Sequence, residues 1–169
     1  MALPDDAALS ALAERVGDLL KSHGHYAAVA ESCTGGWLAK CLTDVAGSSG
    51  WFERGFVSYS NESKQELLGV TEATLKTHGA VSAETVGEMA QGVLSHSRAQ
   101  AAVAVSGIAG PSGGTADKPV GTVWFAWRRS DGAAACRCEV FHGDREAVRR
   151  QAVAVALAGL AELYGSRPT

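Results

Sequence analysis

The sequence has little excess charge and no long apolar run, and each absence removes a class of function. Its 15 basic and 18 acidic residues leave a net charge of −3, too little positive charge to hold a nucleic acid. No stretch offers the roughly 18 apolar residues of a membrane span, and residues 1–6 lack the basic segment of a signal peptide. We therefore expect a cytoplasmic protein that binds neither nucleic acid nor membrane.

Cysteine is scarce and is not spaced for metal or redox chemistry, because the four cysteines include no C-x-x-C pair. Cys136 and Cys138 are the closest two, and residues at i and i+2 of a strand point to one face. We expect them to be two small core side chains. No His, Asp or Glu pair has ligand spacing either, so we expect no metal and no other cofactor.

The known phosphate-binding fingerprints are also missing. Residues 106–114 read S-G-I-A-G-P-S-G-G and could wrap a nucleotide. They match neither the G-x-x-x-x-G-K-[ST] loop nor the G-x-G-x-x-G turn, so an ATPase or a dinucleotide-binding protein lacks support.

The apolar pattern predicts an α/β fold. Helices are expected to begin near Asp5 or Asp6, Gly35, Asn61, Ser82 and Asp144. Strands are expected at residues 26–30, 54–60, 101–105, 120–127 and 134–141, the last two joined by a hairpin turn. The 169 residues, 46% of them hydrophobic, suit one domain over residues 1–169. We expect a three-layer α/β/α sandwich with a mixed sheet of about five strands.

Three polar or glycine-rich segments follow predicted strands, at residues 31–36, 60–64 and 106–118. Ligands of open α/β sheets gather beyond the carboxyl ends of strands. The three segments are therefore expected to form one site.

Ser32 lies where a strand is expected to turn into a helix. The backbone N–H groups of Thr34, Gly35 and Gly36 would point at a ligand there and could hold an oxyanion. An N-cap role for Ser32 or Thr34 is the alternative. Gly35 and Gly36 favour function, because two glycines weaken a helix start unless a ligand or backbone approaches closely.

A serine nucleophile needs a base, and Lys64 is the candidate. Four histidines lie near helix ends, and His142 alone lies near a strand end. With Asn61 as the cap, Lys64 falls in a first helical turn, where the helix dipole and burial would lower its pKa toward that of a neutral amine. The alternative is an ordinary solvated lysine.

Arg145 repeats this pattern at the start of the last helix, directly after Asp144. An arginine at a helix start is suited to a phosphate, and a surface ion pair is the alternative. Arg149 and Arg150 are expected to be solvated.

Six ordered motifs resemble those of the CinA C-terminal domain family over roughly residues 8–163. They are AESCTGG (30–36), YSNESK (59–64), GAVS (79–82), SGIAGP (106–111), KPVGTV (118–123) and FHGDR (141–145). The family usually has Thr where this chain has Ser106, so the hydroxyl is kept. The resemblance is to the stand-alone form, without the N-terminal molybdopterin-binding-like domain of larger members.

The resemblance implies hydrolysis of the carboxamide of nicotinamide mononucleotide to nicotinic acid mononucleotide and ammonia, within NAD recycling. It implies Ser32 as nucleophile, Lys64 as general base and a homo-oligomer. By motif position it also implies that the hydroxyls of Thr34, Tyr59 and Ser106 line the site and that Arg145 contacts a phosphate. We further expect Gly35, Gly36, Asn61 and Gly107 to contact the substrate.

Two other functions stay open at this point. A noncatalytic nucleotide-binding module would use the same loops to hold a phosphate and regulate a partner. A serine amidase acting on another small amide would keep the chemistry and change the substrate.

Overall fold

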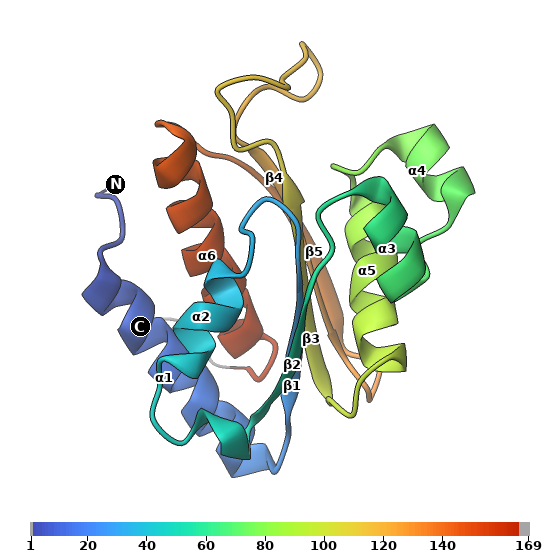
Figure 1. Ribbon diagram of the computed structural model, residues 1–169. Coiled ribbons are helices and arrows are strands. Elements are labelled where there is room, and N and C mark those ends of the chain that lie inside the picture. Colours follow the sequence, from blue (N-terminus) through green and yellow to red (C-terminus); the bar gives the residue numbers. More distant parts are fainter. Residues whose placement is uncertain (1, 166–169) are drawn as a thin grey trace.

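A mixed five-stranded sheet forms the centre of the molecule (Figure 1). The computed structural model describes residues 2–165. The strands are β1 (Ala27–Glu31), β2 (Phe52–Val57), β3 (Ala101–Gly107), β4 (Thr122–Arg129) and β5 (Ala134–Val140). Their order is β2-β1-β3-β4-β5; β1 is parallel to β2 and β3, whereas the β3–β4 and β4–β5 pairs are antiparallel.

Helices cover both faces of the sheet. One face carries α1 (Asp6–His23), α2 (Trp37–Thr43) and α6 (Arg145–Glu162), and the other carries α3 (Asn61–Leu68), α4 (Glu72–His78) and α5 (Ala83–Ser95) (Figure 1). The predicted three-layer α/β/α arrangement is confirmed. None of the helices within residues 2–165 is long and apolar enough to cross a membrane.

Strict alternation along the central strands makes two separate cores. Val29 and Val103 pack in the core under α1, α2 and α6, whereas Ala28, Ala30 and Ala102 pack in the core under α5. Successive side chains of a strand point to opposite faces, so the buried apolar residues of one strand contribute to both cores.

Several expected boundaries differ from the structure. Strand β2 ends at Val57 rather than at residue 60, and β4 spans Thr122–Arg129 rather than residues 120–127. Helix α4 was not predicted, because its seven residues bury only Leu75 and show no helical periodicity. The early end of β2 leaves residues 58–60 as a loop, which contributes to the site described below.

The expectation that Cys136 and Cys138 are core residues is wrong, because both are exposed on the edge strand β5. The face of β5 that α6 covers is instead the one from which Arg137 projects. Its guanidinium lies over the ring of Trp127, 5.5 Å from the centroid, and pairs with Glu162 of α6 at 2.9 Å. A long arginine stem can cover an aromatic ring while its charged end finds a partner, so alternation alone pointed to the wrong face.

We expect Gly159→Ala to destabilise the protein. The added Cβ would lie 2.2 Å from the buried indole of Trp127, whose Nε1 donates to the Ala156 carbonyl oxygen at 2.9 Å. Overpacking of this kind costs about 1–3 kcal/mol, measurable by urea unfolding. Gly87→Ala is the control. Gly87 lies in α5, and its added Cβ would meet no neighbouring atom within 4 Å, so this change should stabilise the protein slightly. Equal effects of the two changes would contradict this packing argument.

Candidate active site

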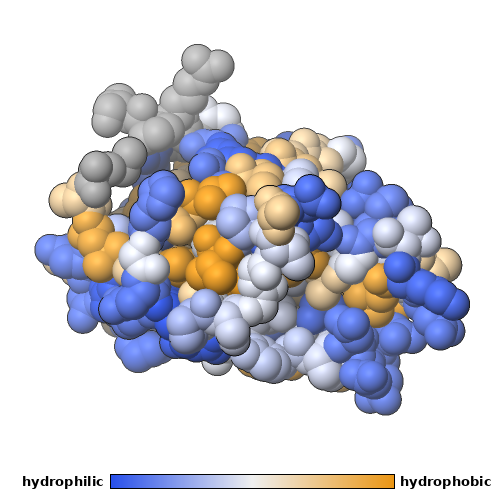
Figure 2. All heavy atoms as spheres, turned by 90° about the horizontal axis from the view of Figure 1, so that it is seen from above, coloured by the Kyte–Doolittle hydropathy of each residue, from blue (hydrophilic) through white to orange (hydrophobic). Residues whose placement is uncertain are grey.

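A cavity of about 300 Å³ lies at the edge of the sheet where β1, β2 and β3 end. Parallel neighbours place their carboxyl ends at one edge, so segments far apart in the sequence meet there. Seven of the ten residues expected at the site line this cavity. They are Ser32, Tyr59, Asn61, Lys64, Ser106, Gly107 and Arg145. Figure 2 shows the molecule from above, and in this view hydrophilic residues make up most of the outline of the molecule.

Lys64 is the most unusual side chain in this cavity, because it is only 1% exposed. Its Nζ lies 3.1 Å from Ser32 Oγ, 2.9 Å from the Ser58 carbonyl oxygen and 3.0 Å from the Tyr59 carbonyl oxygen. No carboxylate within residues 2–165 pairs with it. Burial lowers the pKa of Lys64 from its ordinary value of 10.5, because the ammonium form loses its hydration. An exposed, solvated lysine is therefore not what the chain forms.

Helix α3 positions Lys64, and its cap differs from the expected one. The Ser60 hydroxyl accepts a hydrogen bond from the Ser63 N–H at 3.1 Å, so Ser60 is the N-cap and Asn61 is the first helical residue. The Lys64 side chain consequently extends toward the loop that follows β2. The shorter strand and the shifted cap together bring the carbonyl groups of Ser58 and Tyr59 onto the lysine.

The serine turn, defined as residues 32–36, joins β1 to α2. The Ser32 N–H donates to the Val105 carbonyl oxygen at 3.0 Å, which fixes the turn to the end of β3. Gly35 and Gly36 adopt φ angles of +58° and +101°, the left-handed region that glycine enters without strain. The two glycines are therefore required by the backbone itself.

Glu31, rather than a ligand, satisfies the start of α2. This carboxylate is 1% exposed and accepts hydrogen bonds from the Leu38 N–H at 2.8 Å and the Ala39 N–H at 3.0 Å. Neither Ser32 nor Thr34 caps the helix, so the N-cap alternative is not realised. Ser32 Oγ therefore does not serve the helix, and it contacts Lys64 Nζ at 3.1 Å and the Tyr59 carbonyl oxygen at 3.4 Å.

The expected roles of Thr34, Gly35 and Gly36 need correction. The Gly35 N–H donates to the Ser32 carbonyl oxygen at 3.1 Å, so it closes the turn and is not available to a ligand. Thr34 is fully buried and does not line the cavity, and its Oγ1 has no hydrogen-bond partner within the described residues. Gly35 and Gly36 line a different cavity, behind the turn.

Arg145 and Tyr59 form the rim of the site. Arg145 Nη1 donates to the Gly110 carbonyl oxygen at 2.8 Å, and its Nη2 lies 3.3 Å from Tyr59 Oη. Asp144 caps α6 through the Ala147 N–H, as predicted. Among residues 2–165 no carboxylate pairs with Arg145, so the surface ion pair does not form. Its positive charge remains available to an anionic ligand.

Two functional side chains escaped the sequence analysis. Glu31 was assigned to the polar segment 31–36 after a predicted strand, and nothing in its local pattern shows that its carboxylate binds the next helix. Arg149 was expected to be solvated, but its guanidinium donates to carbonyl oxygens of the serine turn. A signal was present, since Arg149 follows Arg145 by one helical turn and so shares its helix face.

The model of the CinA C-terminal domain family matches residues 9–164. The chain belongs to this family. The resemblance inferred from the six motifs is thus confirmed for the CinA C-terminal domain.

Named relatives agree with this assignment. Nicotinamide-nucleotide amidohydrolase PncC from Escherichia coli (strain K12) is 59% identical over 152 residues, which are 90% of this chain and 92% of that protein. The protein of the same name from Pseudomonas putida is 50% identical over 92% of this chain and 96% of its own length. A CinA-like protein of Akkermansia muciniphila is 51% identical, but the match covers only 34% of it, so this CinA C-terminal domain also has relatives in longer proteins.

Solved structures share the fold. The competence/damage inducible protein CihA from Agrobacterium tumefaciens superimposes with a TM-score of 0.90 at 43% identity, covering 96% of this chain and 98% of the other. The CinA superfamily protein KP700603 from Klebsiella pneumoniae gives a TM-score of 0.89 at 42% identity, with 93% and 98% covered.

We expect Glu31→Ala to lower the free energy of unfolding by about 2–3 kcal/mol, because two N–H groups at the start of α2 lose a charged acceptor. Glu31→Gln should lose less, since its amide oxygen can still accept. Urea unfolding measures both, and Glu62→Ala, an exposed acid in the first turn of α3, is the control. Wild-type stability in Glu31→Ala would show that the capping bonds do not matter.

Proposed function

We propose that this CinA C-terminal domain is an amidohydrolase that converts nicotinamide mononucleotide to nicotinic acid mononucleotide and ammonia. The observation that carries the proposal is the 3.1 Å contact between Ser32 Oγ and the buried, unpaired Lys64 amine. Relatives at 50–59% identity that bear the name nicotinamide-nucleotide amidohydrolase support the substrate.

The surroundings of Lys64 suit a general base. A neutral lysine amine has two N–H bonds and one lone pair. The carbonyl oxygens of Ser58 and Tyr59 accept both N–H bonds, which leaves the lone pair for the hydroxyl proton of Ser32. Burial lowers the pKa of Lys64 and so favours this neutral form, which lets Lys64 accept a proton at a lower pH than an ordinary lysine can.

The reaction then proceeds in two balanced halves. Ser32 Oγ attacks the amide carbon while its proton passes to Lys64, and the carbonyl oxygen becomes an oxyanion. The Lys64 ammonium returns the proton to the departing nitrogen, the C–N bond breaks and ammonia leaves. Water, deprotonated by Lys64, next hydrolyses the acyl ester, releasing the carboxylic acid and restoring the serine hydroxyl.

Other lining groups supply binding. The Cys33 N–H directly follows the nucleophile, and it is the oxyanion donor that we assign in place of Gly35. Arg145, which pairs with no carboxylate in the described part of the chain, would bind the phosphate of the mononucleotide. Tyr59, Asn61, Ser106 and Gly107 line the same cavity and would contact the ring or the ribose.

We also propose that residues 1–169 form a single domain, and that the protein is a cytoplasmic homo-oligomer. The family match over residues 9–164 supports the first part. The exposed Cys136, Cys138 and Val140 on the edge strand β5 support the oligomer, because apolar edge surface tends to be covered. Light scattering during gel filtration measures the assembly, and a monomeric mass would exclude it.

We expect the wild-type protein to release ammonia from nicotinamide mononucleotide, but not from nicotinamide or glutamine, because only the mononucleotide offers Arg145 a phosphate. Ser32→Ala should lower turnover by on the order of 1,000-fold or more while retaining the fold. Binding without ammonia release would identify a noncatalytic nucleotide-binding module. Release from another small amide would keep the chemistry and replace the substrate.

The pH dependence of kcat provides a separate test of Lys64. A protonated amine cannot accept the serine proton, so activity should be lost as pH falls through the lysine pKa. Because burial lowers that pKa, the midpoint of the rise in kcat with pH should lie below 10.5. Lys64→Arg, which stays protonated, should be inactive across the range. An active arginine variant would exclude the lysine as base.

A further inference from the structure

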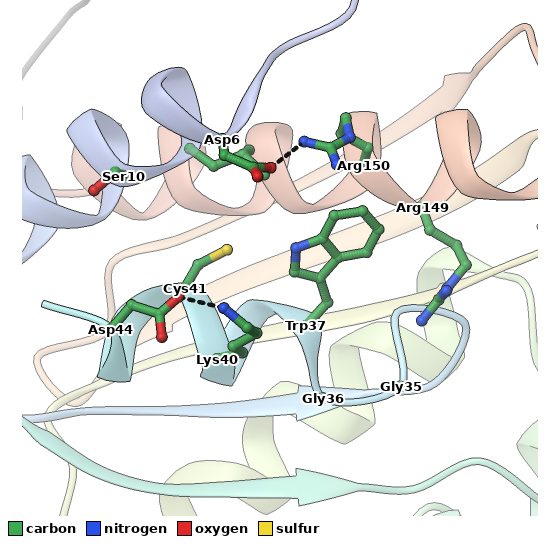
Figure 3. A pocket seen from close by; sticks show the side chains of 11 residues that line it. Asp6, Ser10, Gly35, Gly36, Trp37, Lys40, Cys41, Asp44, Arg149 and Arg150 are labelled. Atoms are coloured by element: carbon green, nitrogen blue, oxygen red, sulfur yellow. Dashed lines mark hydrogen bonds and ion pairs between the residues drawn. The ribbon is translucent and has the colours of Figure 1, made fainter.

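Arg149 of α6 reaches across to the serine turn from the side opposite the active-site cavity. Its Nε donates to the Cys33 carbonyl oxygen at 3.0 Å, and its Nη2 donates to the Thr34 carbonyl oxygen at 3.1 Å. These carbonyls belong to the first two residues after Ser32. Figure 3 shows the Arg149 side chain extending from its helix toward the loop that carries Gly35.

These two bonds determine how the peptide groups of the turn are oriented. In a trans peptide the C=O and the following N–H point in opposite directions. By holding the Cys33 and Thr34 carbonyls, Arg149 also sets the directions of the Thr34 and Gly35 N–H groups. The Gly35 N–H needs its orientation to reach the Ser32 carbonyl oxygen at 3.1 Å. Arg149 therefore holds the turn in the shape that the Gly35 bond closes.

The turn has a particular need for such a clamp. Gly35 and Gly36, at φ +58° and +101°, have no side chains to restrict the backbone. A flexible backbone after the nucleophile would allow Ser32 Oγ to move away from Lys64. Charge-assisted hydrogen bonds are roughly twice as strong as neutral ones, so one guanidinium provides an effective restraint.

The charge of Arg149 is committed to the turn. Within residues 2–165 no carboxylate pairs with it, whereas its neighbour Arg150 pairs with Asp6 and Glu146. Both arginines pack on the ring of Trp37, with centroid distances of 5.5 Å for Arg149 and 4.9 Å for Arg150. The two residues thus share their contact with Trp37, but only Arg149 binds the turn, whereas Arg150 binds two carboxylates.

A cavity of about 720 Å³ lies behind the turn, lined by residues of α1, α2 and α6 (Figure 3). Arg149 lines it and does not line the cavity of Ser32. It therefore cannot act by touching the substrate. The cavity also gives a small cation access to the position that the Arg149 guanidinium occupies.

We propose that Arg149 is a positioning residue, which holds Ser32 in the geometry for attack by clamping the Cys33 and Thr34 carbonyl groups. The inference rests on the proposed function, because it takes Ser32 as the nucleophile. Misplacement of a reacting atom by about 1 Å can lower a rate on the order of 100-fold without weakening substrate binding. Loss of Arg149 should therefore lower kcat and leave KM nearly unchanged.

The test compares Arg149→Ala with the matched control Arg150→Ala. Ammonia release from nicotinamide mononucleotide gives kcat and KM, and thermal unfolding gives Tm. We expect kcat to fall roughly 10- to 100-fold in Arg149→Ala, with KM within about twofold of wild type. Arg150→Ala should keep its kcat. Equal kcat values in the two variants, or a kcat loss that follows Tm in both, would overturn the inference.

Chemical rescue adds a readout that a merely structural role would not move. Millimolar guanidinium chloride, entering through the cavity, should restore part of kcat in Arg149→Ala and leave Arg150→Ala unaffected; no rescue would count against the clamp. Hydrolysis of p-nitrophenyl acetate separates this inference from the substrate assignment. The rate that counts is the part that depends on Ser32, which is the part that Ser32→Ala abolishes. A lower rate in Arg149→Ala supports the clamp even if nicotinamide mononucleotide is not turned over, and an unchanged rate overturns it.

Discussion

The rest of this structure depends on one constraint, a buried lysine amine that has no carboxylate partner among residues 2–165. An isolated buried ammonium costs several kcal/mol, so Lys64 needs polar partners and is biased toward its neutral form. Its partners are two carbonyl oxygens from the loop after β2 and the hydroxyl after β1. They can meet only if β1 and β2 run side by side in parallel and end together, which is what the sheet order provides. The need of Lys64 for polar partners thus links the order of the strands to the chemistry of the site.

The start of α2 shows how the chain keeps Ser32 free for this contact. A helix that begins directly after a strand normally draws a nearby hydroxyl into capping its N–H groups. Here the buried Glu31 carboxylate accepts from Leu38 and Ala39 instead. The serine turn is therefore held by groups other than the Ser32 hydroxyl: Glu31 below it, the Val105 carbonyl beside it and Arg149 behind it. This separation of support from chemistry allows the turn to be rigid while its one reactive oxygen stays available.

Much of this organisation follows from the sequence, and the failures have physical causes. Apolar periodicity and cap residues predicted the layers, the mixed sheet and the gathering of Ser32 and Lys64, because hydrophobic burial dominates those features. The roles of Glu31 and Arg149 could not be read locally, since both side chains act on segments other than their own. The exposed Cys136 was misjudged for a related reason: the face of an edge strand depends on which helix covers it, and Arg137 can cover an aromatic ring as well as an apolar residue can. Long-range polar contacts are thus the part of the site that one sequence leaves open.

The neighbouring cysteine sharpens the assignment of the nucleophile. Thiols are intrinsically better nucleophiles than hydroxyls, and Cys33 lies next to Ser32 at the same cavity. However, Cys33 is only 6% exposed, and burial raises the pKa of its thiol to about 11. The positive charge of Arg149 opposes this shift without overcoming it, so the thiol stays protonated at neutral pH. Within the described residues 2–165 no side-chain nitrogen is hydrogen-bonded to the Cys33 sulfur, whereas Ser32 Oγ lies 3.1 Å from Lys64 Nζ. The weaker nucleophile is the one with a base within reach, and that proximity outweighs intrinsic reactivity.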